Sequence, residues 1–297
     1  MNQTVLIGAD PETFIQQIDA SRRQWNVLPA FGLFGGTKQR PVPMKDMPEG
    51  FCYLEDNAAL EFNIPPQKTA ADFVETVGAA RRYLRDMVLP KHNADFMSNN
   101  RIELTVDHLK DPRSQTVGCE PDHDAYANNG AQRPAFEGKD LGNERYAGGH
   151  IHLSYNFDAI PAFVAARFLD LYLTLPWLEY DRQGARRPLY GKAGLFRPKK
   201  YGLEYRTPSN WWVWQAERTQ QQFVMGAEYF ARRSYEPEYL RLLSEAYARF
   251  PWSDLQKIIE AEDHDTGQQL IALANRQFRL NVGIQPIPRG RLRPGRG

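Results

Sequence analysis

The chain has 297 residues, of which 42% are hydrophobic and 25% are charged, a composition typical of one globular domain with an ample core. The formal net charge of +1 excludes a strong overall field that would draw the protein to nucleic acid or to a membrane surface. Two cysteines are too few for a disulfide framework. Because we also find no signal-peptide pattern and no apolar run of ~20 residues, we expect a cytoplasmic protein without a membrane span.

The N-terminal half of the chain is predicted to be rich in strands. One helix is expected in it, where apolar residues keep helical spacing and Thr69 with Asp72 resembles a capping box. The predicted elements are strands at residues 4–14, 51–65 and 100–109, and the helix at 69–89.

The C-terminal half begins with a predicted loop and a short strand and then becomes helical. Residues 119–147 are rich in Gly, Pro, Asn and Asp, so a long loop is expected, and the segment AGGHIHLSYN at 147–156 is interpreted as a strand. Residues 187–210 mix basic loop and strand. Helices are predicted at 159–180, 211–233, 237–250 and 252–262, with Pro161 in the first turn of the first of them.

This order of elements predicts an α+β fold with a largely antiparallel sheet rather than a doubly wound fold. No glycine-rich loop of the Walker or dinucleotide type is present. We predict a single domain over residues 1–285. The remaining segment, PIPRGRLRPGRG at 286–297, is interpreted as a disordered basic tail, and the alternative is a weak contact with phosphate groups.

Polar residues recur at a spacing of two in four of the predicted strand segments. Residues i and i+2 of a strand point to the same face, so these side chains are expected to meet on one face of a sheet. The pairs are Asp10 with Glu12, Glu61 with Asn63, His150 with His152, and Glu204 with Arg206, and Glu55 and Asp56 lie just before the second pair.

Carboxylates on one face repel one another, and a pair of them ~4 Å apart costs several kcal/mol. We therefore expect bound cations. Oxygen ligands with one or two imidazoles favour Mg²⁺ or Mn²⁺ over Zn²⁺. Arg197, Lys199 and Lys200 stand near the last pair, where a polyphosphate would need positive charge. Simpler roles also fit: turn residues for Asp10 and Glu12, a solvated hairpin tip for Glu55 and Asp56, a structural pair for the two histidines, and a cross-strand ion pair for Glu204 and Arg206.

Taken in order, five segments resemble the phage-type amidoligases of the carboxylate–amine (COOH.NH2) ligase family, in the glutamine synthetase and glutamate–cysteine ligase superfamily. The segments are GADPETF, EDNAALEFNIPP, GCEPD, GGHIHLS and GLEYRTPSN, and they span residues 8–210. The resemblance implies a curved, mainly antiparallel sheet whose concave face binds ATP and divalent ions. It also implies amide or peptide bond formation through an acyl phosphate, in the host cytoplasm if the protein is encoded by a phage.

The resemblance assigns a role to each polar residue of these segments. One metal ion would be held by Glu12, Asp56 and Glu61, with Glu55 as the alternative to Asp56, and a second by Asp10, His150 and Glu204. His152 would contact the nucleotide. Arg197 and Arg206 would bind phosphate and act in catalysis, assisted by Lys199 or Lys200. Glu120, Asp122 and Asn63 are the candidates for substrate binding, and an ordered surface turn is the alternative for the loop that carries the first two.

The resemblance leaves the two substrates open beyond a small-molecule or peptide carboxylate and an amine. Two other functions also fit this sequence: a non-catalytic phage structural or assembly protein on the same fold, and a metal-dependent amide hydrolase that needs no ATP. Nucleic acid is expected to contact only the basic tail, and the sequence predicts no oligomeric state.

Overall fold

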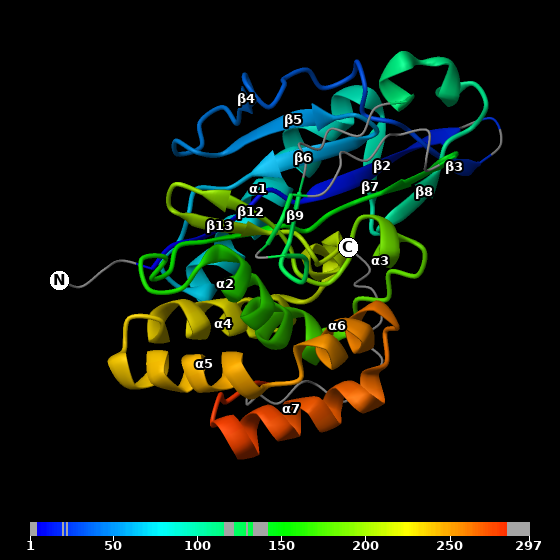
Figure 1. Ribbon diagram of the computed structural model, residues 1–297. Helices are drawn as coiled ribbons and strands as arrows, with labels where there is room; N and C mark the ends of the chain where they lie inside the picture. Colours follow the sequence, from blue (N-terminus) through cyan, green and yellow to red (C-terminus); the bar gives the residue numbers. More distant parts are fainter. Residues whose placement is uncertain are drawn as a thin grey trace.

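The computed structural model describes residues 5–19, 21, 23–115, 122–128, 130–132 and 142–283. Strands gather on one side of the molecule, and the helices of the C-terminal part stack on the other side (Figure 1). Every strand pairing among the described residues is antiparallel. The predicted α+β class with an antiparallel sheet is therefore confirmed.

Two sheets make up most of the strand layer. The five-stranded sheet has the order β1 (Ile7–Ala9), β11 (Ile151–Leu153), β13 (Gly202–Tyr205), β12 (Leu195–Lys199) and β9 (His123–Asp124). The other main sheet has the order β3 (Gln24–Val27), β2 (Glu12–Asp19), β6 (Ala59–Asn63), β5 (Cys52–Asp56) and β4 (Val42–Pro43), and β7 (Ala94–Met97) also pairs with β2. A separate ribbon joins β8 (Arg101–Glu103) to β10 (Glu144–Tyr146).

The two main sheets meet at residues 10 and 11, where the chain passes from β1 into β2. Strand β6 runs along both, because the Ile64 N–H donates to the Ala9 carbonyl at 3.3 Å and the Phe62 N–H to the Pro11 carbonyl at 3.3 Å. Pro11 has no N–H to donate to a ladder, which favours a break between the strands here. Asp10 therefore lies at the junction of the two sheets.

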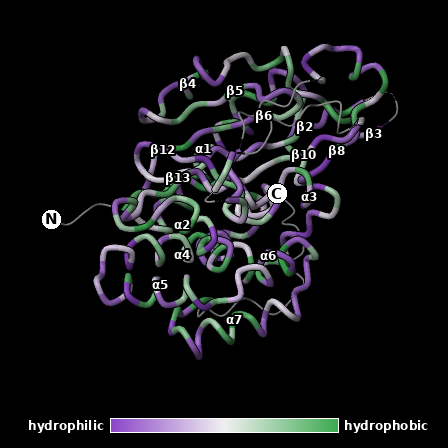
Figure 2. Tube along the Cα trace, in the orientation of Figure 1, coloured by the Kyte–Doolittle hydropathy of each residue, from purple (hydrophilic) through white to green (hydrophobic). Residues whose placement is uncertain are grey.

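The seven α-helices of the described chain are α1 (Ala70–Tyr83), α2 (Ala162–Leu169), α3 (Arg186–Leu189), α4 (Glu217–Arg233), α5 (Pro237–Arg249), α6 (Trp252–Glu260) and α7 (His264–Phe278). Helices α1 and α2 continue as π-helical turns, η1 (Leu84–Val88) and η6 (Asp170–Thr174). Hydrophobic and hydrophilic positions alternate along α4, α5 and α7 (Figure 2), as expected for helices that cover a core with one face. No helix among the described residues is both long enough and apolar enough to span a membrane.

Strand alternation separates a covered face of the five-stranded sheet from an open one. On β11, Ile151 and Leu153 are fully buried in the core. On β13, the buried Tyr205 donates its hydroxyl to Asp170 Oδ1 at 2.6 Å behind the sheet. Burial raises the pKa of Asp170 to about 7, although hydrogen bonds from Tyr205 and other donors oppose the shift. The residues that alternate with these apolar positions point their side chains to the open face.

Three details differ from the sequence prediction. Segment 51–65 is a hairpin rather than one strand, because Asn57 adopts the left-handed backbone conformation (φ 55°) that a two-residue turn requires. Only the start of 100–109 is a strand, and a 3₁₀ turn (His108–Lys110) follows. Helix α7 was not predicted. Residues 286–297, the proposed tail, lie outside the described residues.

The remaining predicted helices are present, with shorter bounds. Thr69 caps α1, since its hydroxyl accepts from the Asp72 N–H at 3.1 Å, so the predicted helix start at Thr69 is confirmed. Segment 211–233 begins as a 3₁₀ turn, η8 (Asn210–Trp214), before α4. Shorter 3₁₀ turns are η2 (Leu89–His92), η4 (Pro112–Gln115) and η7 (Leu175–Trp177).

Candidate functional site

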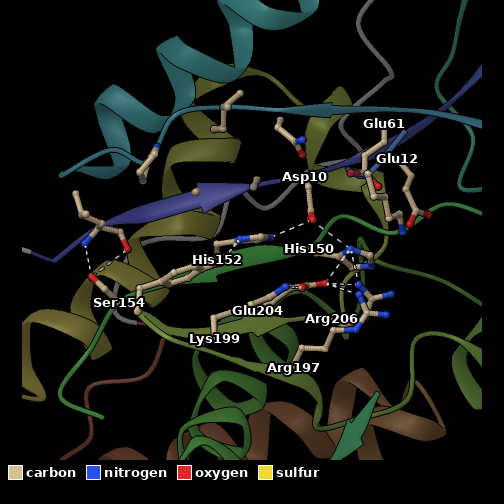
Figure 3. A pocket seen from close by; sticks show the side chains of 18 of the residues that line it. Asp10, Glu12, Glu61, His150, His152, Ser154, Arg197, Lys199, Glu204 and Arg206 are labelled. Atoms are coloured by element: carbon tan, nitrogen blue, oxygen red, sulfur yellow. Dashed lines mark hydrogen bonds and ion pairs between the residues drawn. The ribbon is translucent and has the colours of Figure 1, made fainter. Parts of the chain in front are cut away.

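A pocket of about 570 Å³ opens where the two sheets meet, on the face away from the helices that pack on β12 and β13. In Figure 3 the side chains of Asp10, His150, His152, Glu204 and Arg206 point toward one another. The polar residues that line the pocket come from both sheets and from adjoining loops and turns. They are Asp10, Glu12, Lys38, Glu61, Asn63, His150, His152, Ser154, Arg197, Lys199, Tyr201, Glu204 and Arg206.

Strand register explains why residues so distant in sequence meet in this pocket. His152 lies opposite Gly8 on one side and opposite Glu204 on the other, and Glu204 lies opposite Arg197. One row therefore crosses four strands. Because side chains of residues two apart share a face, Arg206 follows Glu204 on the same side of the sheet, as the spacing of the polar pairs predicted.

The first group of candidate metal ligands is Asp10, His152 and Glu204, which we call the histidine trio. Their ligand atoms all lie within 4.8 Å of one another, and His152 Nε2 is 3.1 Å from Asp10 Oδ2. Burial opposes ionisation of Asp10, but the charge of His152 and hydrogen bonds from both histidines outweigh it and hold the Asp10 pKa well below its ordinary value.

Three cationic side chains surround Glu204, which is a member of this trio. Lys199 Nζ lies 2.8 Å from Glu204 Oε2, Arg197 Nη1 lies 3.5 Å from Oε1, and Arg206 also bonds Oε1. Burial would raise the pKa of Glu204, but the charge of Arg206 and of the two histidines lowers it, so the carboxylate stays ionised. The histidine trio is therefore well supplied with positive charge.

The second group, Glu12, Asp56 and Glu61, is named the acidic trio. Glu12 and Glu61 face each other across β2 and β6, and Asp56 comes from the end of β5. Their ligand atoms also lie within 4.8 Å of one another. Lys38 Nζ lies 3.1 Å from Asp56 Oδ2. Burial, followed by repulsion from Asp10 and Asp56, raises the pKa of Glu61 well above its ordinary value despite Lys38.

The structure distinguishes Glu55 from Asp56, which the sequence left open. The Glu55 carboxylate accepts three backbone hydrogen bonds of 2.7 Å, from the N–H groups of Gly32, Phe34 and Gly35. Glu55 thus holds the loop before β4. The Asp56 side chain is the one that joins the acidic trio.

His150 lies behind the histidine trio rather than within it. The side chain is 2% exposed, and its Nδ1 is 3.4 Å from Asp10 Oδ1 and 3.1 Å from Arg206 Nη1. Its Nε2 lies against Gly148, where a Cβ atom would be 2.2 Å away, so only glycine fits there. His150 thus presents one ring nitrogen to the pocket, and its role as a metal ligand stays a prediction.

The other predicted site residues divide between the pocket and its surroundings. Lys199 lines the pocket, whereas Lys200 is exposed in the following turn and is not part of the lining. Asp122 pairs with both arginines, at 3.2 Å from Arg197 Nε and 2.8 Å from Arg206 Nε. Asn63 lines the pocket and donates to Cys52 Sγ at 3.4 Å. Glu120 lies outside the described residues.

Three residues that reach the site from loops or turns were missed from the sequence. Lys38 comes from a loop before β4, Tyr190 from the segment after α3, and Tyr201 from the turn between β12 and β13. None belongs to a polar pair with a spacing of two. Only Tyr201 had a sequence signal, since it lies between the predicted cationic segment and the Glu204–Arg206 pair.

The ligand chemistry of both trios fits divalent cations. The acidic trio offers three carboxylates, which is a hard oxygen set of the kind Mg²⁺ and Mn²⁺ prefer, and the histidine trio offers two carboxylates and one imidazole. Repulsion from Asp10 and Asp56 adds to burial in raising the pKa of Glu61, although Lys38 lowers it. A bound cation would relieve this repulsion.

The fold and the pocket thus define an α+β protein with two carboxylate-rich groups and several cations around one cavity. Residues 141–249 match the family model described as phage phiEco32-like COOH.NH2 ligase-type 2. The matched segment carries both histidines and the Glu204–Arg206 pair, and it supports the resemblance to the phage-type amidoligases, a family named for carboxylate–amine ligation. A comparison with curated protein sequences found no match.

Proposed function

We propose that this protein is an ATP- and Mg²⁺-dependent (or Mn²⁺-dependent) ligase that joins a carboxylate to an amine, on a glutamine synthetase-like curved sheet. The family match supports ligation. The observation that carries the rest is the uneven charge of the pocket, where Lys199, Arg197 and Arg206 surround one trio and Lys38 faces the other. This asymmetry suits a polyphosphate beside a second anion.

In this proposal the histidine trio lies beside the ATP phosphates, and the acidic trio lies nearer the substrate carboxylate. Divalent ions held by Asp10, His152 and Glu204 and by Glu12, Asp56 and Glu61 would supply positive charge that lets two anions approach each other. Arg197 and Arg206 would bind the phosphate oxygens and stabilise the charge of the transferred group. Asp122 keeps both guanidinium groups in place.

The chemistry itself takes two steps. A carboxylate oxygen of the substrate attacks the γ-phosphorus of ATP, the bond to the bridging oxygen breaks, and ADP leaves with an acyl phosphate remaining. The amine nitrogen then attacks the acyl carbon, the carbon–oxygen bond to phosphate breaks, and the nitrogen loses a proton to give the amide. Asn63, at the pocket wall beside Glu61, is placed to hydrogen-bond a substrate.

The proposal is tested by calorimetric titration with ATP in the presence and absence of Mg²⁺. We expect binding that needs the metal and weakens at least tenfold in Asp10→Asn and in Glu12→Gln. Glu245→Gln is the control, since Glu245 forms an exposed helical pair with Arg249 far from the pocket. ADP release would then be screened over pairs of carboxylates and amines.

Two results would replace this proposal. Folded wild-type protein that binds no ATP at millimolar Mg²⁺ would favour a non-catalytic phage structural or assembly protein. Amide cleavage that needs the metal but ignores ATP would favour a hydrolase. Either way the pocket residues stay the same, and only the chemistry assigned to them changes.

A further inference from the structure

Tyr190 contacts a ligand of the acidic trio from outside the pocket. Its hydroxyl donates to Glu12 Oε1 at 2.9 Å. The other carboxylate oxygen, Oε2, accepts from the Gly148 N–H at 2.7 Å. Both oxygens of Glu12 are therefore fixed in orientation, while carboxylate oxygens have enough acceptor capacity to bind a cation as well.

The position of Tyr190 is itself fixed by buried polar groups. The guanidinium carbon of Arg186, which is fully buried, lies 4.9 Å from the centre of the Tyr190 ring. The next residue is Gly191, where a Cβ atom would be 1.9 Å from Gln183 Oε1, so only glycine lets the chain pass. Tyr190 also accepts a hydrogen bond of 3.2 Å from Arg206 Nη2. One hydroxyl thus links the acidic trio to Arg206, which pairs with Glu204 of the histidine trio.

Tyr201 makes the corresponding contact with the histidine trio. Its hydroxyl lies 2.6 Å from Nδ1 of His152, and the two rings stack with centroids 6.1 Å apart and an interplanar angle of 18°. The opposite nitrogen, Nε2, faces Asp10. A hydrogen bond on one ring nitrogen fixes the orientation of the imidazole and leaves the other nitrogen for the site.

We propose that Tyr190 and Tyr201 are a pair of positioning residues, each of which orients one metal ligand of one trio. Tyr190 orients Glu12 in the acidic trio, and Tyr201 orients His152 in the histidine trio. The inference rests on the metal sites of the proposed function. Groups that orient a metal ligand in this way typically change metal affinity by about 10–100-fold when they are removed.

The test is a Mn²⁺ titration without nucleotide, followed by the electron paramagnetic resonance signal of free Mn²⁺. Wild-type protein is expected to bind two ions. Tyr190→Phe and Tyr201→Phe should each weaken one of the two by about tenfold or more. The control is Tyr229→Phe, which removes a hydroxyl that bonds Arg233 and Asn281 away from the pocket. Thermal unfolding without Mn²⁺ checks that each variant is folded.

A Glu61→Gln background identifies the ion that each tyrosine affects. This change removes a ligand of the acidic trio alone, so Tyr190→Phe should add little to it, whereas Tyr201→Phe should still weaken the remaining ion. If wild-type protein binds two ions and both phenylalanine variants bind them equally well, the positioning role is wrong and the metal sites stand. If folded wild-type protein binds no Mn²⁺, both the positioning role and the metal sites are wrong.

Discussion

The two trios share one pocket but differ in how their charge is balanced. Asp10 and Glu204 of the histidine trio have lowered pKa values, because both histidines and Arg206 offset the cost of burial. Glu61 of the acidic trio has a raised pKa, because burial and its carboxylate neighbours act together against ionisation. Similar side chains at similar depth therefore differ through the charges beside them.

This difference indicates which trio has its negative charge balanced by the side chains of the protein alone. In the histidine trio the positive charges beside Asp10 and Glu204 favour the ionised carboxylates in the folded chain. Burial and neighbouring carboxylates oppose ionisation of Glu61 in the acidic trio, and a cation that bound only the folded state would add stability through mass action. One pocket thus holds a cluster whose charges are balanced next to one whose charges are not, as expected where function rather than stability selects the residues.

Glu204→Gln should have the largest effect on stability. Glu204 is 1% exposed, and the change leaves Arg197, Lys199 and Arg206 without the carboxylate they share. Removing one partner of a buried ion pair typically costs about 3–5 kcal/mol, so we expect a loss of this size in the free energy of unfolding at pH 7. Urea unfolding with a metal chelator present measures it.

The matched control for this variant is Glu245→Gln, which breaks an exposed helical pair with Arg249. We expect a change below about 0.5 kcal/mol. Equal effects of the two variants would show that Glu204 is not a buried ion-pair partner, and the contrast between the trios would fail.

Glu61→Gln should change stability in the opposite direction. The substitution removes a carboxylate whose ionisation is opposed by burial, Asp10 and Asp56, so the chelated variant should be more stable than wild type at pH 7. Added Mn²⁺ should stabilise wild type more than the variant, because the variant lacks one ligand. Urea unfolding with and without Mn²⁺ gives both results, and a destabilised chelated variant would contradict the comparison.

The sequence predicted much of this site because strand alternation is local. His152, Glu204 and Arg206 share a face as a direct consequence of a spacing of two, and the sheet class followed from the order of elements. Which candidate ligands come together from different strands depends instead on strand register. His152 rather than His150 lies opposite Glu204, and no pattern within one strand reveals its partner on the next.

The site residues that come from loops and turns could not be predicted from strand alternation. Tyr190 reaches Glu12 because buried Arg186 and Gly191 fix the turn after α3, a contact between residues 178 positions apart. Glu55 and Asp56 were indistinguishable in sequence because the tertiary contacts of the hairpin that turns at Asn57 decide which of them joins the acidic trio. Such features depend on tertiary packing, which periodicity does not encode.

The pH dependence of stability should separate wild type from Glu61→Gln. In metal-free wild type the folded state holds a proton on Glu61 above its ordinary pKa of 4.5, whereas the unfolded state has lost it. The contribution of Glu61 to the free energy of unfolding is therefore fully present below pH 4.5, and it is lost as pH rises through the pKa of Glu61 in the folded state. We expect the variant to lack this fall, so its advantage over wild type should grow with pH across that window. Urea unfolding at a series of pH values measures the difference, and parallel curves would show that the Glu61 pKa is not raised.

Lys38→Met should have the smallest effect on stability and should mainly shift that pH window. The Lys38 side chain is 39% exposed in its pair with Asp56, so the direct loss should stay below about 1 kcal/mol. Because Lys38 lowers the pKa of Glu61, its removal should move the upper end of the window to higher pH. Lys199→Met is the matched control, because it removes a lysine that pairs with Glu204 of the histidine trio. It should leave the pH window set by the Glu61 pKa unchanged. If both lysine variants shifted the window equally, the two trios would form one electrostatic unit, and the separate roles proposed for them would have to be abandoned.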